Sequence, residues 1–181
     1  MTAALGVSKQ IYEVIDRKSR IADLPGALQS FELNGRIDFH AVHFRYPTAP
    51  DEMRSTFERV TFAIKAGEST AIVGPSGSGK STIVQLIERF YDPQSGFILF
   101  DSVDIRKISL RALRESIGYV PQEPAMIIGT IRENLLYGNR DATDKQIKDA
   151  LRRANATFVY DFEARLETFI GSGSVVNLSG G

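Results

Sequence analysis

Residues 74–81, with the sequence GPSGSGKS, combine residue types that can hold a phosphate chain. They fit the spacing G-x-x-x-x-G-K-[ST] in full, after a short apolar run and before a segment with helical patterning. Glycines let backbone N–H groups approach phosphate oxygens, and the following helix would present free N–H groups and the positive end of its dipole. The sequence therefore predicts a phosphate-binding loop, called the P-loop below.

Two side chains add charge and metal chemistry to this loop. Lys80 would supply a positive charge for the β- and γ-phosphates, and Ser81 would offer its hydroxyl to Mg²⁺, which prefers oxygen ligands. The alternative is a Gly/Ser-rich strand-to-helix loop without a ligand, which the complete motif and its context disfavour. A P-loop indicates a nucleotide and leaves the reaction open. No Asn-Lys-x-Asp motif occurs, which argues against a small GTPase, whereas a nucleoside kinase is compatible with the loop.

Strands and helices are predicted to alternate around the P-loop. Residues 70–74 and 117–120 are short, continuous apolar runs, as buried parallel strands are, and helical patterns cover residues 80–90 and 109–116. This alternation predicts an α/β fold. Residues 36–46 change apolar phase partway along, which predicts a β-bulge, and the β-rich stretch around them predicts an additional antiparallel layer.

Helix starts and a connector can also be located. Capping boxes at Thr130–Glu133 and Thr143–Gln146 predict two helices, the second with Ile147, Ala150, Leu151 and Ala154 on one face. Residues 4–17 have the pattern of an amphipathic helix, and Pro25 with Gly26 ends any helix after it.

Composition bounds the class of protein. The chain has 181 residues with 22 Lys+Arg and 22 Asp+Glu, and this balance without like-charge runs argues against a nucleic-acid binder. The absence of cysteine excludes disulfides and thiolate metal sites. No apolar run reaches the roughly 18 residues that a membrane-spanning helix needs.

Further motifs give a resemblance to a known family. GPSGSGKST is followed by YVPQEP and then by LSGG. From about residue 7 onward the chain resembles the nucleotide-binding domain of an ATP-binding cassette (ABC) transporter, most closely of the multidrug-resistance-type exporters. The resemblance implies an α/β P-loop NTPase core with a mainly parallel sheet, an antiparallel β-subdomain near the N-terminus and a helical subdomain before the signature, incomplete at the C-terminus. Residues 1–30 would be the exporter linker helix and connector, and residues 31–181 the N-terminal part of the domain.

The resemblance also implies site roles, with ATP and Mg²⁺ as cofactors. Tyr46 matches the aromatic residue that stacks on adenine, although it could be an edge-strand tyrosine. Gln122 matches the glutamine that reaches Mg²⁺ and the attacking water, although it could be an ordinary loop residue. The implied catalytic residues are Lys80 and Gln122, the metal ligands Ser81 and Gln122, and the nucleotide-binding residues Tyr46, Gly74, Pro75, Ser76, Gly77, Ser78, Gly79, Lys80, Ser81, Thr82 and Gln122.

LSGG matches the family's signature, which closes over the nucleotide of a partner domain. The implied signature residues are Leu178, Ser179, Gly180 and Gly181. The resemblance thus implies a head-to-tail pair with a second nucleotide-binding domain, the transmembrane domain of the same transporter as a further partner, and no nucleic acid. The implied location is the cytoplasmic face of a membrane, through transmembrane helices that these residues do not include.

The sequence departs from the family pattern at several places. Ser102 stands where glycine is usual, Met126 and Ile128 replace the usual residues after the glutamine loop, and Ser172 stands where exporters commonly carry glutamate. The aspartate that holds Mg²⁺, the glutamate that activates water and the switch histidine, all of which follow the signature in the family, do not occur. His40 and His43 precede the P-loop and are predicted to be strand residues.

Three functions remain as hypotheses. The first is the ATP-binding motor domain of an ABC exporter, which couples ATP binding and hydrolysis to transport. The second is a truncated, non-catalytic nucleotide-binding fragment, because the residues needed for hydrolysis do not occur. The third is a soluble ABC-type ATPase, but the stretch between the P-loop and LSGG holds neither a long coiled coil nor a basic arm.

Overall fold

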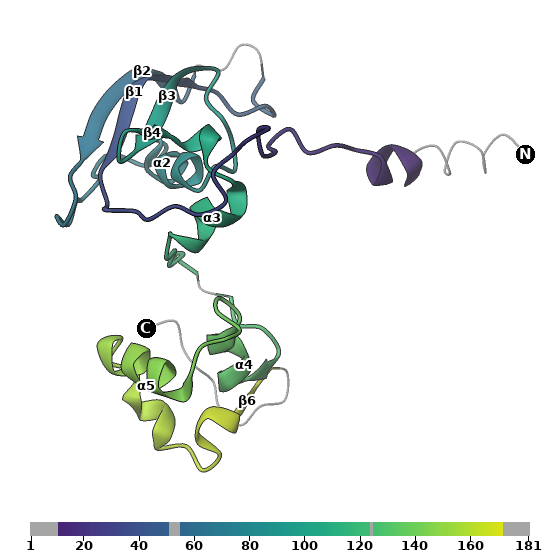
Figure 1. Cartoon of the computed structure of the whole chain (residues 1–181), viewed down its shortest axis with the longest axis vertical. Coiled ribbons are helices and arrows are strands. Elements are labelled where there is room, and N and C mark those ends of the chain that lie inside the picture. The colour runs from purple at the N-terminus through teal and green to yellow at the C-terminus, as the bar shows by residue number, and fades with distance from the viewer. Residues whose placement is uncertain (1–10, 51–54, 124, 172–181) are drawn as a thin grey trace, which may run out of the picture. The chain divides into compact units, whose positions relative to one another are not determined.

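The computed structural model describes residues 11–50, 55–123 and 125–171. The chain forms two compact units, residues 1–118 (the N-terminal unit) and residues 119–181 (the C-terminal unit), shown in Figure 1. The predicted connector is tied into the first unit, because Leu28 bridges Ile108 and the Asp23 carboxylate accepts a hydrogen bond from the backbone N–H of Leu110 at 2.7 Å. The domain boundary predicted at residue 30 stays a prediction.

A four-stranded antiparallel sheet forms the frame of the N-terminal unit. Its strands are β1 (Ile37–Phe44), β2 (Phe57–Ile64), β3 (Ser95–Phe100) and β4 (Val103–Asp104), in the order β2-β1-β3-β4. Helix α2 (Lys80–Ile87) packs against this sheet, as Figure 1 shows. The antiparallel layer predicted from the sequence is confirmed.

The core of the N-terminal unit joins the sheet to two helices. Helix α3 (Leu110–Glu115) follows the 3₁₀ helix η1 (Ile105–Lys107), and the Ser109 hydroxyl caps α3 by accepting from the N–H of Ala112. Aromatic side chains of the strands pack with aliphatic side chains of the helices, each contributing about 1.5–3 kcal/mol by burial. The buried residues are Phe39, Val42, Phe44, Phe57, Ile83, Leu86, Ile98, Phe100, Ile105, Ile108, Ala112 and Leu113.

The bulge predicted in the first strand is confirmed. The register of β1 against β2 shifts between Phe39 and Val42, and Ala41 has a φ of 45°. Gly96 on the neighbouring strand makes the bulge possible, because a Cβ at this position would lie 2.4 Å from the carbonyl oxygen of His40. His40 and His43 lie in β1 as predicted, and the His40 ring stacks on Phe97.

The two strand predictions at residues 70–74 and 117–120 are wrong for this structure. Neither run is a strand, and Val73 and Val120 are 87% and 86% exposed. An apolar run becomes a strand only where a neighbour satisfies its backbone N–H and C=O groups. No ladder partner for either run lies within the described ranges, where the sheet ladders are antiparallel.

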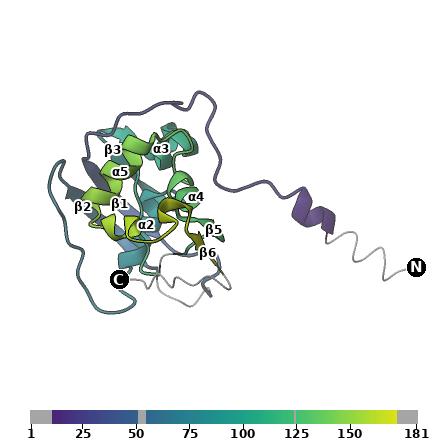
Figure 2. The same ribbon diagram turned by 90° about the horizontal axis from the view of Figure 1, so that it is seen from below.

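The C-terminal unit is mainly helical. It contains α4 (Ile131–Leu136), α5 (Asp144–Arg153), the 3₁₀ helices η2 (Thr157–Tyr160) and η3 (Arg165–Glu167), and the paired short strands β5 (Gly129–Thr130) and β6 (Phe169–Ile170). Figure 2 shows β5 and β6 beside α4. The buried core consists of Ile131, Ile147, Leu151, Val159, Leu166 and Ile170.

Both predicted capping boxes are present. The Thr130 hydroxyl accepts from the N–H of Glu133, whose carboxylate accepts from the N–H of Thr130, and Thr143 and Gln146 form the same reciprocal pair. Of the four residues predicted to share one face of α5, Ile147 and Leu151 are buried, whereas Ala150 and Ala154 are exposed. Their side chains end at Cβ, so the longer Ile147 and Leu151 make the core contacts.

The helix predicted over residues 4–17 is described in part. Residues 11–15 are helical, and Ile11, Tyr12, Val14 and Ile15 are all more than half exposed. No helix within the described ranges has the length and apolar character needed to cross a bilayer.

Candidate functional site

The backbone of the P-loop takes a shape that its glycines permit. Gly77 and Gly79 have φ values of 78° and 90°, in the left-handed region that side chains other than glycine rarely adopt. A Cβ at position 79 would also lie 2.6 Å from Cε1 of Phe57 on β2. Contact with the sheet and the left-handed turn therefore both require glycine directly before α2.

Helix α2 begins at Lys80 with an N-terminus suited to an anion. Gly79 is its N-cap, no side chain caps it, and its first turn holds no acidic residue. The first N–H groups of a helix have no intrahelical partner and carry the positive end of the dipole. This end of α2 can therefore donate backbone hydrogen bonds to phosphate oxygens.

The Lys80 side chain folds back over its own loop. Its ammonium donates to the carbonyl oxygen of Gly74 at 2.9 Å and to that of Pro75 at 2.8 Å. An ammonium has three donors, so this geometry holds the charge at the loop and leaves a third N–H for a phosphate oxygen. Ser81 follows it with an exposed side chain that can offer a hydroxyl to Mg²⁺. The donor set thus fits a triphosphate with its metal.

An apolar cavity of 560 Å³ adjoins the P-loop. Ser78, Lys80 and Ile83 line it on the P-loop side. Thr56, side chains of β2 and residues 70–73 line the rest. The cavity lies beside the residues whose strand prediction failed.

The Tyr46 side chain, just after β1, contacts the P-loop helix directly. Its hydroxyl donates to Oε1 of Gln85 at 2.8 Å and lies 2.8 Å from Oγ1 of Thr82. Its ring makes edge contacts with Phe44 and Tyr91, at centroid distances of 4.9 and 5.3 Å. The structure thus brings together Tyr46 and Thr82, two of the predicted nucleotide-binding residues.

Gln85 was not predicted from the sequence. It lies three residues after Thr82, and residues at this spacing share one face of a helix. That spacing, together with the polar side chain, was the available signal. The Thr82 side chain is buried with only 4% exposure and is bonded to Tyr46, so its backbone N–H is the group left to face a ligand.

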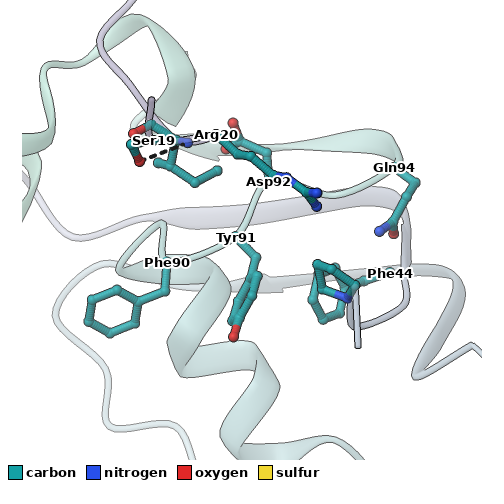
Figure 3. A pocket seen from close by; sticks show the side chains of 9 residues that line it. Ser19, Arg20, Phe44, Phe90, Tyr91, Asp92 and Gln94 are labelled. Carbon is teal, nitrogen blue, oxygen red and sulfur yellow. Dashed lines mark hydrogen bonds between the residues drawn. The ribbon is translucent and has the colours of Figure 1, made fainter. Parts of the chain in front are cut away.

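A second cavity adjoins Phe44 and Tyr91, the two aromatic residues that contact the Tyr46 ring. It has a volume of 420 Å³ and is drawn in Figure 3, where Phe44, Phe90 and Tyr91 form one side and Ser19 and Arg20 of the connector another. The neighbouring Arg89 is buried, pairs with Asp92 at 2.9 Å and donates to the carbonyl oxygen of Ala22 at 3.2 Å. These contacts dock the connector on the N-terminal unit.

The remaining predicted site residues are not tested by this structure. Gln122 is exposed and belongs to the C-terminal unit, and the structure describes the two units separately. Asn134, which was not predicted from the sequence, holds the segment after Gln122. It accepts a hydrogen bond from the N–H of Ile127 and donates one to the Ile127 carbonyl oxygen, both at 2.8 Å. The signature residues 178–181 and Ser172 lie outside the described residues.

No metal ligand cluster stands out beyond the P-loop. Among the residues that the structure describes, no group of three or more His, Asp or Glu side chains could hold a metal ion. The predicted metal ligands, Ser81 and Gln122, lie in different units, so the metal site stays a prediction.

Comparison with known proteins decides the family. The family model described as "ABC transporter" matches residues 57–181, more than half of the chain. The chain belongs to the ABC transporter family. The predicted family is thereby confirmed. The matched range contains β2, the P-loop and the helices from α2 to α5.

Individual relatives agree with this ABC assignment. The chain is 41% identical over 178 residues to an "ATP-dependent permease MDL1" of Candida albicans, covering 98% of this chain and 26% of the relative. It is 42% identical over 179 residues to "ABC transporter B family member 1" of Dictyostelium discoideum, covering 98% and 19%. The chain thus spans about a quarter or less of these curated relatives.

A solved structure gives the same assignment for the fold. The chain matches the "Structure of a bacterial Atm1-family ABC exporter with ATP bound" with a TM-score of 0.80 and 34% identity, over 94% of this chain and 30% of that one. The predicted fold class, a P-loop NTPase fold with an antiparallel β-subdomain, is confirmed by this match. The chain is therefore similar to the nucleotide-binding part of an ABC exporter.

Proposed function

We propose that this chain binds MgATP at residues 74–82 and serves as the ATP-binding motor of an ABC exporter. The observation that carries the proposal is the P-loop geometry: two left-handed glycines, an uncapped N-terminus of α2 and the Lys80 ammonium held over the loop. In support, relatives carry the names ATP-dependent permease and ABC transporter, and the similar solved exporter has ATP bound.

Each residue of the site has a distinct task in this proposal. Backbone N–H groups of residues 79–82 donate to phosphate oxygens, and Lys80 places its charge on the β- and γ-phosphates. Tyr46 stacks on the adenine, and Ser81 with Gln122 holds the metal. Mg²⁺ held by these two residues would supply positive charge that offsets the negative charge of the phosphates.

The proposed cycle needs partners. Two such domains pair head to tail, so that residues 178–181 of one close over the nucleotide of the other, and a transmembrane domain converts closure and reopening into transport. The motor then lies on the cytoplasmic face of the membrane. The shares of 26% and 19% of the relatives' lengths leave room for such a membrane domain in proteins of that size.

We also propose that residues 1–181 alone bind ATP without turning it over. Phosphoryl transfer to water depends on positioning and charge, with a metal-holding carboxylate and a group that orients the attacking water. Gln122 matches the group that orients the water, and no carboxylate pair of the expected kind occurs within residues 1–181.

Two measurements on the same sample test both proposals. The chain of residues 1–181 is titrated with ATP in the presence of Mg²⁺, and phosphate release is then followed at saturating ATP. We expect saturable binding and no turnover above the rate without protein. Absence of binding would contradict the site, whereas turnover at the rate of a complete cassette would contradict only the non-catalytic proposal.

A further inference from the structure

The hydroxyl of Tyr46 lies at the centre of a hydrogen-bond network with Thr82 and Gln85, and the proposed function gives these side-chain hydrogen bonds no role. A tyrosine hydroxyl has one proton, and Tyr46 donates it to Oε1 of Gln85 at 2.8 Å. The contact with Oγ1 of Thr82, also 2.8 Å, is therefore one that Tyr46 accepts. The order of donation is Thr82 to Tyr46 to Gln85.

Both hydrogen-bond partners of the Tyr46 hydroxyl belong to the helix that forms the phosphate site. Thr82 and Gln85 lie three residues apart on α2, whose first residue is Lys80. Thr82 is 4% exposed, so its hydroxyl is held away from water and its geometry is fixed by packing. The hydroxyl end of the Tyr46 ring is thus hydrogen-bonded to α2, the helix whose N-terminal N–H groups face the phosphate site.

The sides of the ring are fixed by two aromatic neighbours. Phe44, at the end of β1, is 1% exposed, and its ring meets that of Tyr46 at 78°. Tyr91, after α2, meets the Tyr46 ring at 87°. Such edge-to-face contacts prefer defined angles, so they limit the tilt of the ring while the hydroxyl sets its distance from α2.

We propose that Gln85 is a positioning residue for adenine recognition. It acts through Tyr46, because it fixes the ring that stacks on the base relative to the P-loop that holds the phosphates. This inference rests on the proposed ATP site and deepens it. A preorganised ring loses less conformational freedom when the base arrives, which is why removal of the anchor weakens binding of the base.

The test separates the base from the phosphates. Isothermal titration in the presence of Mg²⁺ measures the Kd of ATP and of tripolyphosphate for residues 1–181 and for the variants Gln85→Met, Tyr46→Phe and the double variant. Methionine keeps the length of glutamine and removes its acceptor, and phenylalanine removes only the hydroxyl. Gln29→Met is the matched control, because Gln29 is exposed and bonds within the connector. Thermal melts confirm folding.

Gln85→Met and Tyr46→Phe are each expected to weaken ATP binding roughly 3- to 10-fold, the worth of an oriented aromatic contact, with tripolyphosphate unaffected. The double variant is expected to show no further loss, since both changes remove one interaction. If Gln85→Met does not fold, Tyr46→Phe carries the comparison.

Two results would overturn the positioning role alone: unchanged ATP affinity in the single variants, or equal losses for ATP and tripolyphosphate, which indicate general damage to α2. Failure of the unaltered chain to bind either ligand would overturn the ATP site itself, and the inference with it. The two failures are therefore distinguishable.

Discussion

Gly79 joins backbone shape and motif chemistry at one position. Its φ of 90° lies in the left-handed region, and a Cβ there would lie 2.6 Å from Cε1 of Phe57, so this backbone requires the glycine that the motif supplies. The hydrogen bond between Tyr46 and Gln85 could not be predicted from the sequence, because it depends on how β1 and α2 pack together. Sequence spacing places Thr82 and Gln85 on one face but does not state what that face meets.

Ser102 stands at a position where the family usually has glycine, and its φ is 73°. For a residue with a side chain this region costs roughly 1–2 kcal/mol, which glycine avoids. We therefore expect Ser102→Gly to raise the free energy of unfolding of the N-terminal unit by about 1 kcal/mol.

Urea denaturation of residues 1–181, followed by circular dichroism, measures this change. Gly138→Ala is a suitable control for the handling of glycine exchanges, because a Cβ there would meet nothing within 4 Å. No gain in the urea midpoint for Ser102→Gly would show that neighbouring contacts already relieve the strain.

At the scale of elements, helix starts were predicted correctly from adjacent residues, whereas two strands, which depend on a pairing partner, were not. The capping boxes at Thr130 and Thr143 and the start of α2 were predicted correctly because each depends on a few adjacent residues. Residues 70–74 and 117–120 have strand-like composition but no ladder partner among the described residues. A strand forms only when a neighbouring strand pairs with it, so the sequence of one segment alone does not determine whether that segment becomes a strand.

The capping boxes give a prediction for the C-terminal unit. Thr130→Ala removes the acceptor of the Glu133 N–H at 3.1 Å, and helix caps of this kind are worth about 1 kcal/mol. We expect a loss of about that size in the stability of the unit, with faster amide exchange in α4. Hydrogen exchange measures it, with Thr157→Ala at an exposed non-cap position as the control. Unchanged exchange in α4 would mean that the β5–β6 pairing alone holds the helix start.

At the scale of the whole molecule, the chain forms two compact units and spans 26% or less of the curated relatives compared above. Val73 and Val120 expose apolar surface within the two segments that did not form strands. Apolar segments with unpaired backbone are an aggregation hazard, so low protein concentration suits solution work.

Binding of ATP to the Lys80→Ala variant tests the central claim most directly. Removal of the ammonium that bonds to Gly74 and Pro75 takes away a charged hydrogen bond to phosphate, so we expect the Kd for MgATP to rise roughly 10- to 100-fold. Lys148→Ala, an exposed lysine of α5, should leave the Kd unchanged. Equal ATP affinity in the Lys80 variant and the unaltered chain would contradict the assignment of residues 74–81 as the nucleotide site.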